Sequence, residues 1–187
     1  MAKRFFDIIL SLLLFCFLAV PLLLIALVIK LTSKGPVIHW SKRVGTGNEI
    51  FLMPKFRSMY TNTPQVATHL LQNSDSFVTP VGRFLRKTSL DEVPQLFSVL
   101  KGDMSLVGPR PALFNQDDLV QLRTSYGIQN LRPGVTGWAQ INGRDDLPIP
   151  VKVEFDADYM RNSSLLFDCK IIFLTVFKVL LSKGIKH

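Results

Sequence analysis

A run of 22 residues without a charged side chain, Ile8 to Ile29, constrains this 187-residue chain more than any other feature. As a straight α-helix the run would be about 33 Å long, enough to cross a hydrocarbon core of about 30 Å. We therefore expect residues 1–34 to enter a membrane. Residues 35–187 are mixed in composition and are expected to form one globular domain.

Pro21 divides this run into arms of 13 and eight residues. A proline inside a helix removes a backbone hydrogen bond and clashes with the preceding turn, so a bend is expected there. Arms of about 20 Å and 12 Å could not cross alone. Basic residues flank both ends and give no orientation signal: Lys3, Arg4, Lys30 and Lys34. The residues leave a re-entrant hairpin and a simple span equally acceptable, and they disfavour a cleaved signal peptide.

Composition excludes several classes of protein. Hydrophobic residues make up 48% of the chain and include 14 Phe, which excludes intrinsic disorder. The only two cysteines, Cys16 and Cys169, lie in apolar stretches, so we expect buried thiols rather than a disulfide scaffold. The net charge of +8 suggests an anionic partner. Nucleic acid is not expected, because the basic residues form no known binding motif and are not interleaved with aromatic residues.

The remaining pattern predicts a mainly helical fold with a small β element. Two short apolar runs, residues 37–40 and 50–53, flank a turn and predict a hairpin. Helices are expected at residues 119–126 and 153–160. Residues 165–181 are apolar but carry Asp168, Lys170 and Lys178. They are too charged to span a membrane, so they form either a core helix or an amphipathic helix at the membrane interface.

An acidic pair stands at the expected start of another helix. Ser89 and Glu92 have the spacing of a capping box, and Gly102 would end that helix. Pro94 makes an irregular first turn plausible. In such a turn one carboxylate of the pair could attack phosphorus or bind a divalent cation, while the other orients it or handles a proton. The helix dipole and Arg86 should keep Asp91 ionised. The competing interpretation is a capping Glu beside a surface Asp.

Basic residues recur beside Gly and Pro turns, where exposed backbone N–H groups and guanidinium groups together can bind phosphate. This set comprises Lys55, Arg57, Arg83, Arg86, Lys87, Arg110, Arg132 and Arg144. Individually each could be a solvated surface charge. The chain has no phosphate loop of the Walker type, no nucleophile elbow and no zinc spacing among its three histidines, so carboxylates and cations would have to perform any catalysis.

Long ordered motifs make the chain similar to a known family. They are Lys3-Arg4-Phe5-Phe6-Asp7, Gly35-Pro36, Lys55-Phe56-Arg57-Ser58-Met59, Arg86-Lys87-Thr88-Ser89-Leu90-Asp91-Glu92, Pro94-Gln95-Leu96, the stretch 101–111 and the stretch 132–144. With these motifs the chain resembles the monotopic phosphoglycosyl transferases, bacterial sugar transferases that begin glycoconjugate assembly. The resemblance covers nearly the whole chain, and its compact length is similar to that of the small family members.

The resemblance implies a reaction. A sugar 1-phosphate would pass from a UDP-sugar to a polyprenol phosphate, usually undecaprenyl phosphate, with release of UMP. The reaction would take place at the cytoplasmic face of the bacterial inner membrane, among membrane lipids. Asp91 would be the nucleophile of a ping-pong scheme with a covalent phosphosugar intermediate, Glu92 its partner, and Mg²⁺ at Asp91 the cofactor. The sugar and the pathway are not readable; a homodimer is one expectation for the oligomeric state.

The resemblance also assigns candidate binding residues and a topology. The candidates for phosphate contacts are Lys55, Arg57, Arg86 and Arg110; those for the nucleotide sugar are Arg132, Gly134, Gly137 and Arg144. Residues 1–34 would form a re-entrant helix-break-helix bent at Pro21. Many members have Ser-Pro at the break, whereas this chain has Val20-Pro21, so no serine hydroxyl can satisfy the freed backbone groups. A non-catalytic scaffold and a transferase of the CDP-alcohol type fit the residues less well.

Overall fold

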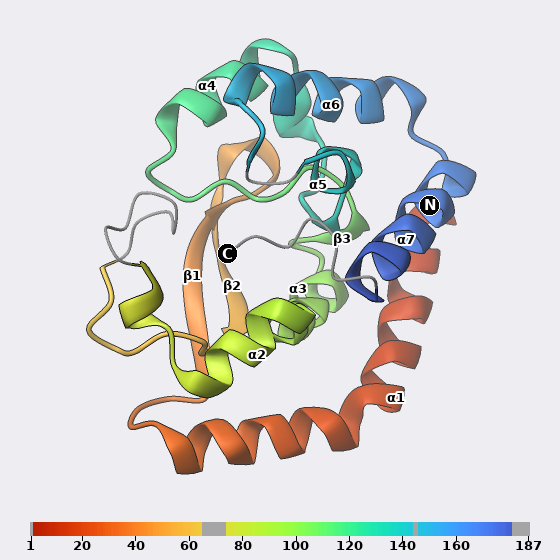
Figure 1. Ribbon diagram of the computed structural model, residues 1–187. Helices are drawn as coiled ribbons and strands as arrows, with labels where there is room; N and C mark the ends of the chain where they lie inside the picture. Colours follow the sequence, from red (N-terminus) through yellow and green to blue (C-terminus); the bar gives the residue numbers. More distant parts are fainter. Residues whose placement is uncertain (1, 65–73, 144–145, 181–187) are drawn as a thin grey trace.

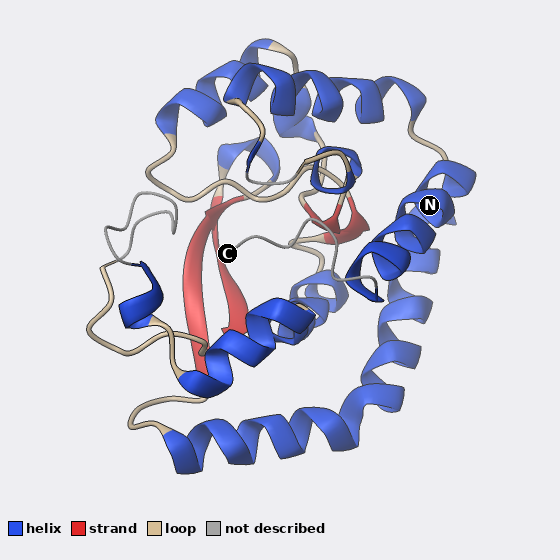
Figure 2. Ribbon diagram, in the orientation of Figure 1, coloured by secondary structure: helices blue, strands red, loops and turns tan. Residues whose placement is uncertain are grey.

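The computed structural model describes residues 2–64, 74–143 and 146–180. Helices dominate the described chain, and two small two-stranded sheets lie among them, as Figures 1 and 2 show. The expected mainly helical fold with a small β element is therefore confirmed. The elements are α1 (Ala2–Thr32), β1 (Ile38–Val44), η1 (Thr46–Asn48), β2 (Ile50–Phe56), η3 (Ser74–Phe77), α2 (Pro80–Thr88), η4 (Leu90–Gln95), α3 (Leu96–Lys101), β3 (Ser105–Val107), α4 (Asp117–Ser125), η5 (Ile128–Asn130), β4 (Gly134–Thr136), α5 (Trp138–Ile141), α6 (Ile149–Asn162) and α7 (Leu165–Leu180).

The apolar run lies in α1, the one helix of the described chain that is long and apolar enough to span a membrane. Figure 1 shows that α1 bends sharply about midway, so that its two arms follow two sides of the globular part. Pro21 lies inside α1 and is the residue that cannot donate to the carbonyl of Phe17. Almost none of the apolar stretch is buried inside the protein.

Both arms of α1 are nevertheless held by the globular part. In the first arm, the buried carboxylate of Asp7 accepts hydrogen bonds from the Ser105 hydroxyl at 2.9 Å and from the Leu106 N–H at 3.2 Å. In the second arm, Ile29 is 1% exposed and packs against Phe56 of β2 and Leu85 of α2. The helix thus begins and ends on the same body.

The predicted hairpin is confirmed. β1 and β2 are antiparallel, and their register pairs Ser41 with Met53 and His39 with Lys55. The turn between them contains Gly47 at φ +66°, a conformation that glycine adopts without strain. Met53 and Phe56 face the core, whereas Trp40 and Leu52 are exposed. Lys55 is therefore carried on a rigid strand.

The chain around the acidic pair differs from the sequence expectation. Ser89 has φ +57° and ψ +16°, ends α2 and directly precedes η4, and its side chain makes no capping hydrogen bond. The predicted capping box is therefore wrong. The irregular start is confirmed, because residues 90–95 form a 3₁₀-helix that contains Pro94 before α3 begins. Gly102, at φ +109°, ends α3 as predicted.

The second sheet joins distant segments. β3 and β4 are parallel, with Ser105 paired to Gly134 and Val107 to Thr136. Residues 132–137 contain two glycines and a proline, which indicate a loop, and a strand of three residues is too short to leave an alternating pattern in the sequence. Figure 1 shows α4 and α6 together at the end of the molecule away from the second arm of α1. The predicted helices at 119–126 and 153–160 correspond to α4 and α6.

Helix α7 is neither wholly a core helix nor wholly a surface helix. Ile171 and Asp168 are buried at its inner face, while Leu166, Phe173 and Phe177 are at least half exposed on the outside. Both cysteines are free and exposed, so the expectation of buried thiols is wrong. Cys169 is exposed although its neighbour in α7, Asp168, is buried, because adjacent helical residues point in different directions.

Candidate active site

The 3₁₀-helix η4 places both members of the acidic pair in the interior. Asp91 is 8% exposed and Glu92 is 9% exposed. The tight turn begins immediately after the left-handed Ser89, and η4 packs against β2, which carries Lys55. The pair is therefore not a capping Glu beside a surface Asp, which was the competing interpretation of the sequence.

Two cations converge on Glu92. The Lys55 Nζ and an Arg110 terminal nitrogen donate to the same oxygen, Oε1, at 2.8 Å and 2.9 Å. The Lys55 and Arg110 side chains are only 16% and 21% exposed. Since charge-assisted bonds in such surroundings are strong, the Glu92 side chain is fixed in place and in turn fixes the two cations. Two positive groups are thereby held beside Asp91.

The pKa of Asp91 is raised to about 6 from a usual value of 3.8, chiefly because the carboxyl is buried. Glu92 contributes to this rise, whereas Lys55, Arg86 and Arg110 oppose it. Arg86 therefore acts in the predicted direction, but desolvation outweighs it. With a pKa of about 6 the carboxyl is still about nine-tenths ionised at pH 7. Asp91 can thus serve as a nucleophile while retaining the basicity of a weakly solvated carboxylate.

The cations around the pair also alter one another. Burial lowers the pKa of Lys55, and Arg110 adds to this effect while Glu92 opposes it. Burial, together with Lys55 and Arg43, lowers the pKa of His39, whose strand position is directly opposite Lys55. Four basic side chains, Lys55, Arg86, Arg110 and Arg43, thus act around two carboxylates, and this excess of basic groups favours binding of a polyanion such as a diphosphate.

A buried ion pair that the sequence analysis missed contacts the backbone of Arg110. Arg123 of α4 donates from Nε and Nη2 to Asp156 Oδ2 of α6, at 2.9 Å and 2.6 Å, and from Nη1 to the Arg110 carbonyl at 2.8 Å. Burial raises the pKa of Asp156, and Arg123 opposes this. The sequence did contain a signal: Val153, Asp156 and Ala157 share one helical face, so an acid stood on an otherwise apolar stripe.

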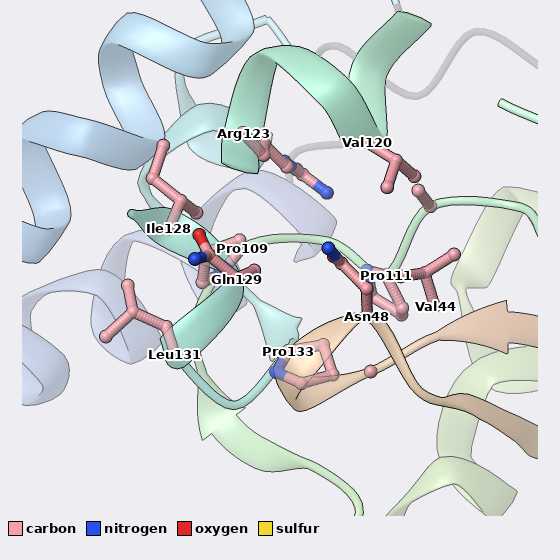
Figure 3. A pocket seen from close by; sticks show the side chains of 12 residues that line it. Val44, Asn48, Pro109, Pro111, Val120, Arg123, Ile128, Gln129, Leu131 and Pro133 are labelled. Carbon is pink, nitrogen blue, oxygen red and sulfur yellow. The ribbon is translucent and has the colours of Figure 1, made fainter. Parts of the chain in front are cut away.

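A small cavity lies behind the Arg110 loop, and Figure 3 shows the side chains of Arg123, Pro109 and Pro111 around it. Its volume is about 30 Å³. A cavity of this size holds one or two water molecules and no nucleotide. It is therefore too small to be the nucleotide-sugar pocket.

Two of the predicted binding glycines have a packing role in the structure. A Cβ atom built on Gly134 would lie 2.1 Å from the Gly108 nitrogen, and one on Gly137 would lie 2.1 Å from the Gly108 carbonyl oxygen. Three glycines thus allow the chain leading to Arg110 to pass directly against the chain that follows Arg132. The prediction that Gly134 and Gly137 contact a nucleotide sugar stays a prediction.

The other predicted residues lie in different places. Arg86 of α2 is within electrostatic range of Asp91. Arg57 is 5% exposed and donates to the Ser33 carbonyl at 2.8 Å and to its hydroxyl at 2.7 Å, which ties β2 to the end of α1. Arg132 is exposed on the loop before β4. Arg144 lies outside the described residues. The structure thus gathers Lys55, Arg86 and Arg110 around the acidic pair and places Arg57 with α1.

A second buried network fixes the first arm of α1 and was also missed. Lys3 donates to Asp168 Oδ2 at 2.6 Å, and the Tyr159 hydroxyl donates to Asp168 Oδ1 at 2.7 Å. Burial and the bond to Asp168 raise the pKa of Tyr159, which therefore remains a neutral donor. Arg4 donates to the carbonyls of Val99 and Leu100 at the end of α3. Asp168 within an apolar run was the available signal.

The donor set accommodates a metal ion only together with a substrate. Among the residues described, no cluster of three or more His, Cys, Asp or Glu side chains could hold one. Mg²⁺ in phosphoryl-transfer sites uses one or two carboxylates, with substrate phosphates and waters as the other ligands. Lys55 and Arg110 engage Glu92, so Asp91 is the carboxylate that fits such an ion.

Comparisons with known proteins identify the family of this chain. The family model for "Bacterial sugar transferase" matches residues 1–182. An Escherichia coli K12 protein named UDP-glucose:undecaprenyl-phosphate glucose-1-phosphate transferase is 46% identical over 97% of this chain and 41% of its own length. A Salmonella typhimurium protein named undecaprenyl-phosphate galactose phosphotransferase is 41% identical over the same shares.

The length of the relatives varies. The chain spans about two fifths of the two enteric proteins. It covers 90% of a Bacillus subtilis protein named uncharacterized sugar transferase EpsL, which is 42% identical over 99% of this chain. The match therefore lies in the segment that all of these proteins share.

Proposed function

Because the chain belongs to the bacterial sugar transferase family, we propose that it transfers a sugar 1-phosphate from a UDP-sugar to a polyprenyl phosphate such as undecaprenyl phosphate. The observation that carries the proposal is the buried carboxylate of Asp91 beside the Glu92–Lys55–Arg110 cluster. The names of the relatives support undecaprenyl phosphate as the acceptor. The sugars in these names differ, glucose in one and galactose in the other, so experiment must identify the sugar of this chain.

In the first step a carboxylate oxygen of Asp91 attacks the phosphorus that carries the sugar. The bond from that phosphorus to the bridging oxygen breaks, and UMP leaves with the bridging oxygen. In the second step a phosphate oxygen of the polyprenyl phosphate attacks the same phosphorus and releases the Asp91 carboxylate. The product is a polyprenyl diphosphate sugar. Lys55, Arg86 and Arg110 offset the charge that would otherwise repel the attacking carboxylate.

Mg²⁺ would be held by Asp91 together with the diphosphate of the donor. When bound, it would supply charge neutralisation at the phosphate oxygens. The chain's own part is to keep Asp91 ionised and out of water, and to hold Lys55 and Arg110 through Glu92. Arg123 positions Arg110 through its backbone carbonyl.

The acceptor is a lipid and the donor is soluble in water, so the reaction belongs at the membrane surface. We place α1 in the membrane as a re-entrant hairpin bent at Pro21, with the globular part on the cytoplasmic face. Support comes from the two anchors of α1 at Asp7 and Ile29, which lie on one body. The exposed apolar face of α7, with Leu166 and Phe173, would lie at the interface.

The nucleophile is tested with radiolabelled UDP-sugar in the absence of acceptor. The wild type should retain about one labelled phosphosugar per chain and release UMP, and polyprenyl phosphate should then discharge the label. Asp91→Asn should retain no label. Asp158→Asn, which alters an exposed carboxylate on α6, should behave as the wild type. Full turnover by Asp91→Asn would remove the assignment.

The topology is tested by cysteine labelling in a background without Cys16 and Cys169. Ala2→Cys and Lys34→Cys should react with an impermeant reagent from the same side of a sealed vesicle. Reaction from opposite sides would mean a true span. Pro21→Ala should shift the segment towards spanning, because a helix that regains its hydrogen bond to residue 17 can straighten. An unchanged pattern would show that Pro21 does not cause the bend.

A further inference from the structure

A mostly apolar groove lies between the first arm of α1 and α7, and Glu92 of the acidic pair is among its lining residues. Figure 1 shows these two helices alongside one another, and the Lys3–Asp168 ion pair joins them. One wall is a stripe of α1 with four-residue spacing: Leu10, Leu14 and Leu18. The other wall is a stripe of α7: Ile172, Val176 and Val179. Each helix thus turns one apolar face into the groove.

Most polar groups that line the groove are satisfied within the protein. The hydroxyls of Thr136 and Thr175 lie 2.7 Å apart and share a hydrogen bond. The Lys178 ammonium donates to the Ile141 carbonyl. Gln140 donates to the Val135 carbonyl at 3.0 Å, while its Oε1 has no hydrogen-bond partner among the described residues. The surface that remains for a ligand along the walls is therefore mostly apolar, and it favours a hydrocarbon chain over a sugar or a nucleotide.

Glu92 and Ser89 line the groove, so it reaches the residue next to Asp91. A phosphate that attacks the phosphosugar phosphorus on Asp91 brings its first carbon atoms close to this neighbouring residue. The groove offers apolar contact at that point. Its position thus fits a ligand with an anionic head at the cluster and a hydrocarbon chain that leads away towards the membrane helices.

The volume sets how much of a chain can enter. The groove has about 270 Å³. An apolar cavity of about 150 Å³ takes up benzene, with six carbons, so by proportion the groove holds about ten carbons. Ten carbons are two isoprene units. The remainder of a long polyprenyl chain would lie in the bilayer beside the exposed apolar residues of α1.

We propose that this groove binds the first two isoprene units of the acceptor, next to its phosphate. The proposal rests on the proposed function, since it takes the acceptor to be a polyprenyl phosphate. It assigns the α1 and α7 stripes to recognition of the acceptor's branched hydrocarbon, separate from the charged cluster that recognises phosphate. The chain of a bulk phospholipid and a second copy of this protein are the alternative occupants that the test must distinguish.

The direct test uses the whole protein in nanodiscs and a geranyl phosphate that carries a diazirine on its second isoprene unit. Photolysis should label peptides that contain residues 10–18 and 172–179, and unlabelled farnesyl phosphate should compete. Labelling confined to other peptides would overturn the proposal. Equal competition by phosphatidylglycerol would assign the groove to bulk lipid, and labelling lost only when copies associate would assign it to a dimer contact.

A matched pair of variants supplies the functional test. Leu14→Trp fills the groove, whereas Leu13→Trp adds the same side chain at the neighbouring position, which is 62% exposed and does not line the groove. Losing contact with two methylene groups of the acceptor costs about tenfold in affinity. Leu14→Trp should raise the KM for polyprenyl phosphate at least tenfold, and Leu13→Trp should leave it unchanged.

The exchange of UMP with UDP-sugar needs no acceptor and separates the two proposals. If the wild type shows no exchange, the ping-pong function fails whatever the groove does. If exchange is normal in all proteins and Leu14→Trp has the same acceptor KM as Leu13→Trp, only the groove assignment fails. Should Leu14→Trp not fold, Val176→Phe on the opposite wall and the photolabelling of the wild type decide the question.

Discussion

Replacing Asp91, the proposed nucleophile, should stabilise the protein while abolishing the proposed activity. The pKa of Asp91 is raised from 3.8 to about 6 in the folded state. Because the pKa of this carboxyl is higher in the folded than in the unfolded state, ionisation of Asp91 at higher pH lowers the free energy of unfolding. The difference of about two pKa units corresponds to about 3 kcal/mol at pH 8. Asp91→Asn removes this cost, because the amide has no charge to desolvate.

The pH dependence of the gain follows from the same two pKa values. The gain should be full at pH 8, about half as large at pH 5, and should vanish only well below pH 3.8, where Asp91 is protonated in both states. For a chain of this length, about 3 kcal/mol corresponds to a rise in Tm of about 6–12 °C. Thermal unfolding of the solubilised protein at pH 8 and pH 5 measures both values.

Asp158→Asn is the control for this experiment, since its carboxylate is exposed and should change Tm little at either pH. A Tm for Asp91→Asn that is equal to or below that of the wild type at pH 8 would refute the reasoning. So would a gain of the same size at both pH values, because the stabilisation would then have no link to ionisation. Loss of labelling by UDP-sugar should accompany the gain.

Two further predictions concern the groups around Asp91. The rate of phosphosugar transfer to the enzyme should fall about tenfold per pH unit below pH 6, which is the midpoint of its pH profile. Lys55→Met should move this midpoint to higher pH, because Lys55 lowers the pKa of Asp91. Glu92→Gln should move it to lower pH, because Glu92 raises that pKa. Shifts in the same direction would contradict the electrostatic assignment. Arg123→Met leaves Asp156 buried without its partner and should cost about 3–5 kcal/mol in thermal unfolding; near-complete recovery in an Arg123→Met, Asp156→Leu double variant would identify the unpaired charge as the cause.

The part of the site that sequence could predict is the part built from neighbours along the chain. Asp91 and Glu92 are adjacent, and their irregular turn follows from Pro94. The capping box failed for a local reason as well: α2 ends one residue before η4, so Ser89 must adopt the left-handed conformation that closes α2. Its hydroxyl therefore makes no capping bond to η4. A four-residue pattern contains no information on what precedes it.

The contacts that the sequence could not predict join segments far apart. Lys55 and Glu92 are 37 residues apart, and Arg123 and Asp156 are 33 apart. Each of these acids stood out in its own helix or turn, but its partner among 22 basic residues was not defined by spacing. Strand β4 was missed for the same reason, because its pairing with β3 and the approach of Gly134 to Gly108 are tertiary features.

Because α1 is anchored to the globular part at both Asp7 and Ile29, its length is constrained more strictly than that of a membrane helix with a free end. An inserted residue in the first arm would rotate everything that follows by about 100° and advance it by about 1.5 Å. Asp7 and Ile29 could then no longer both reach their sites. In the proposed membrane arrangement, the number of residues between these two anchors therefore sets the height of the Asp91 carboxylate above the hydrocarbon core.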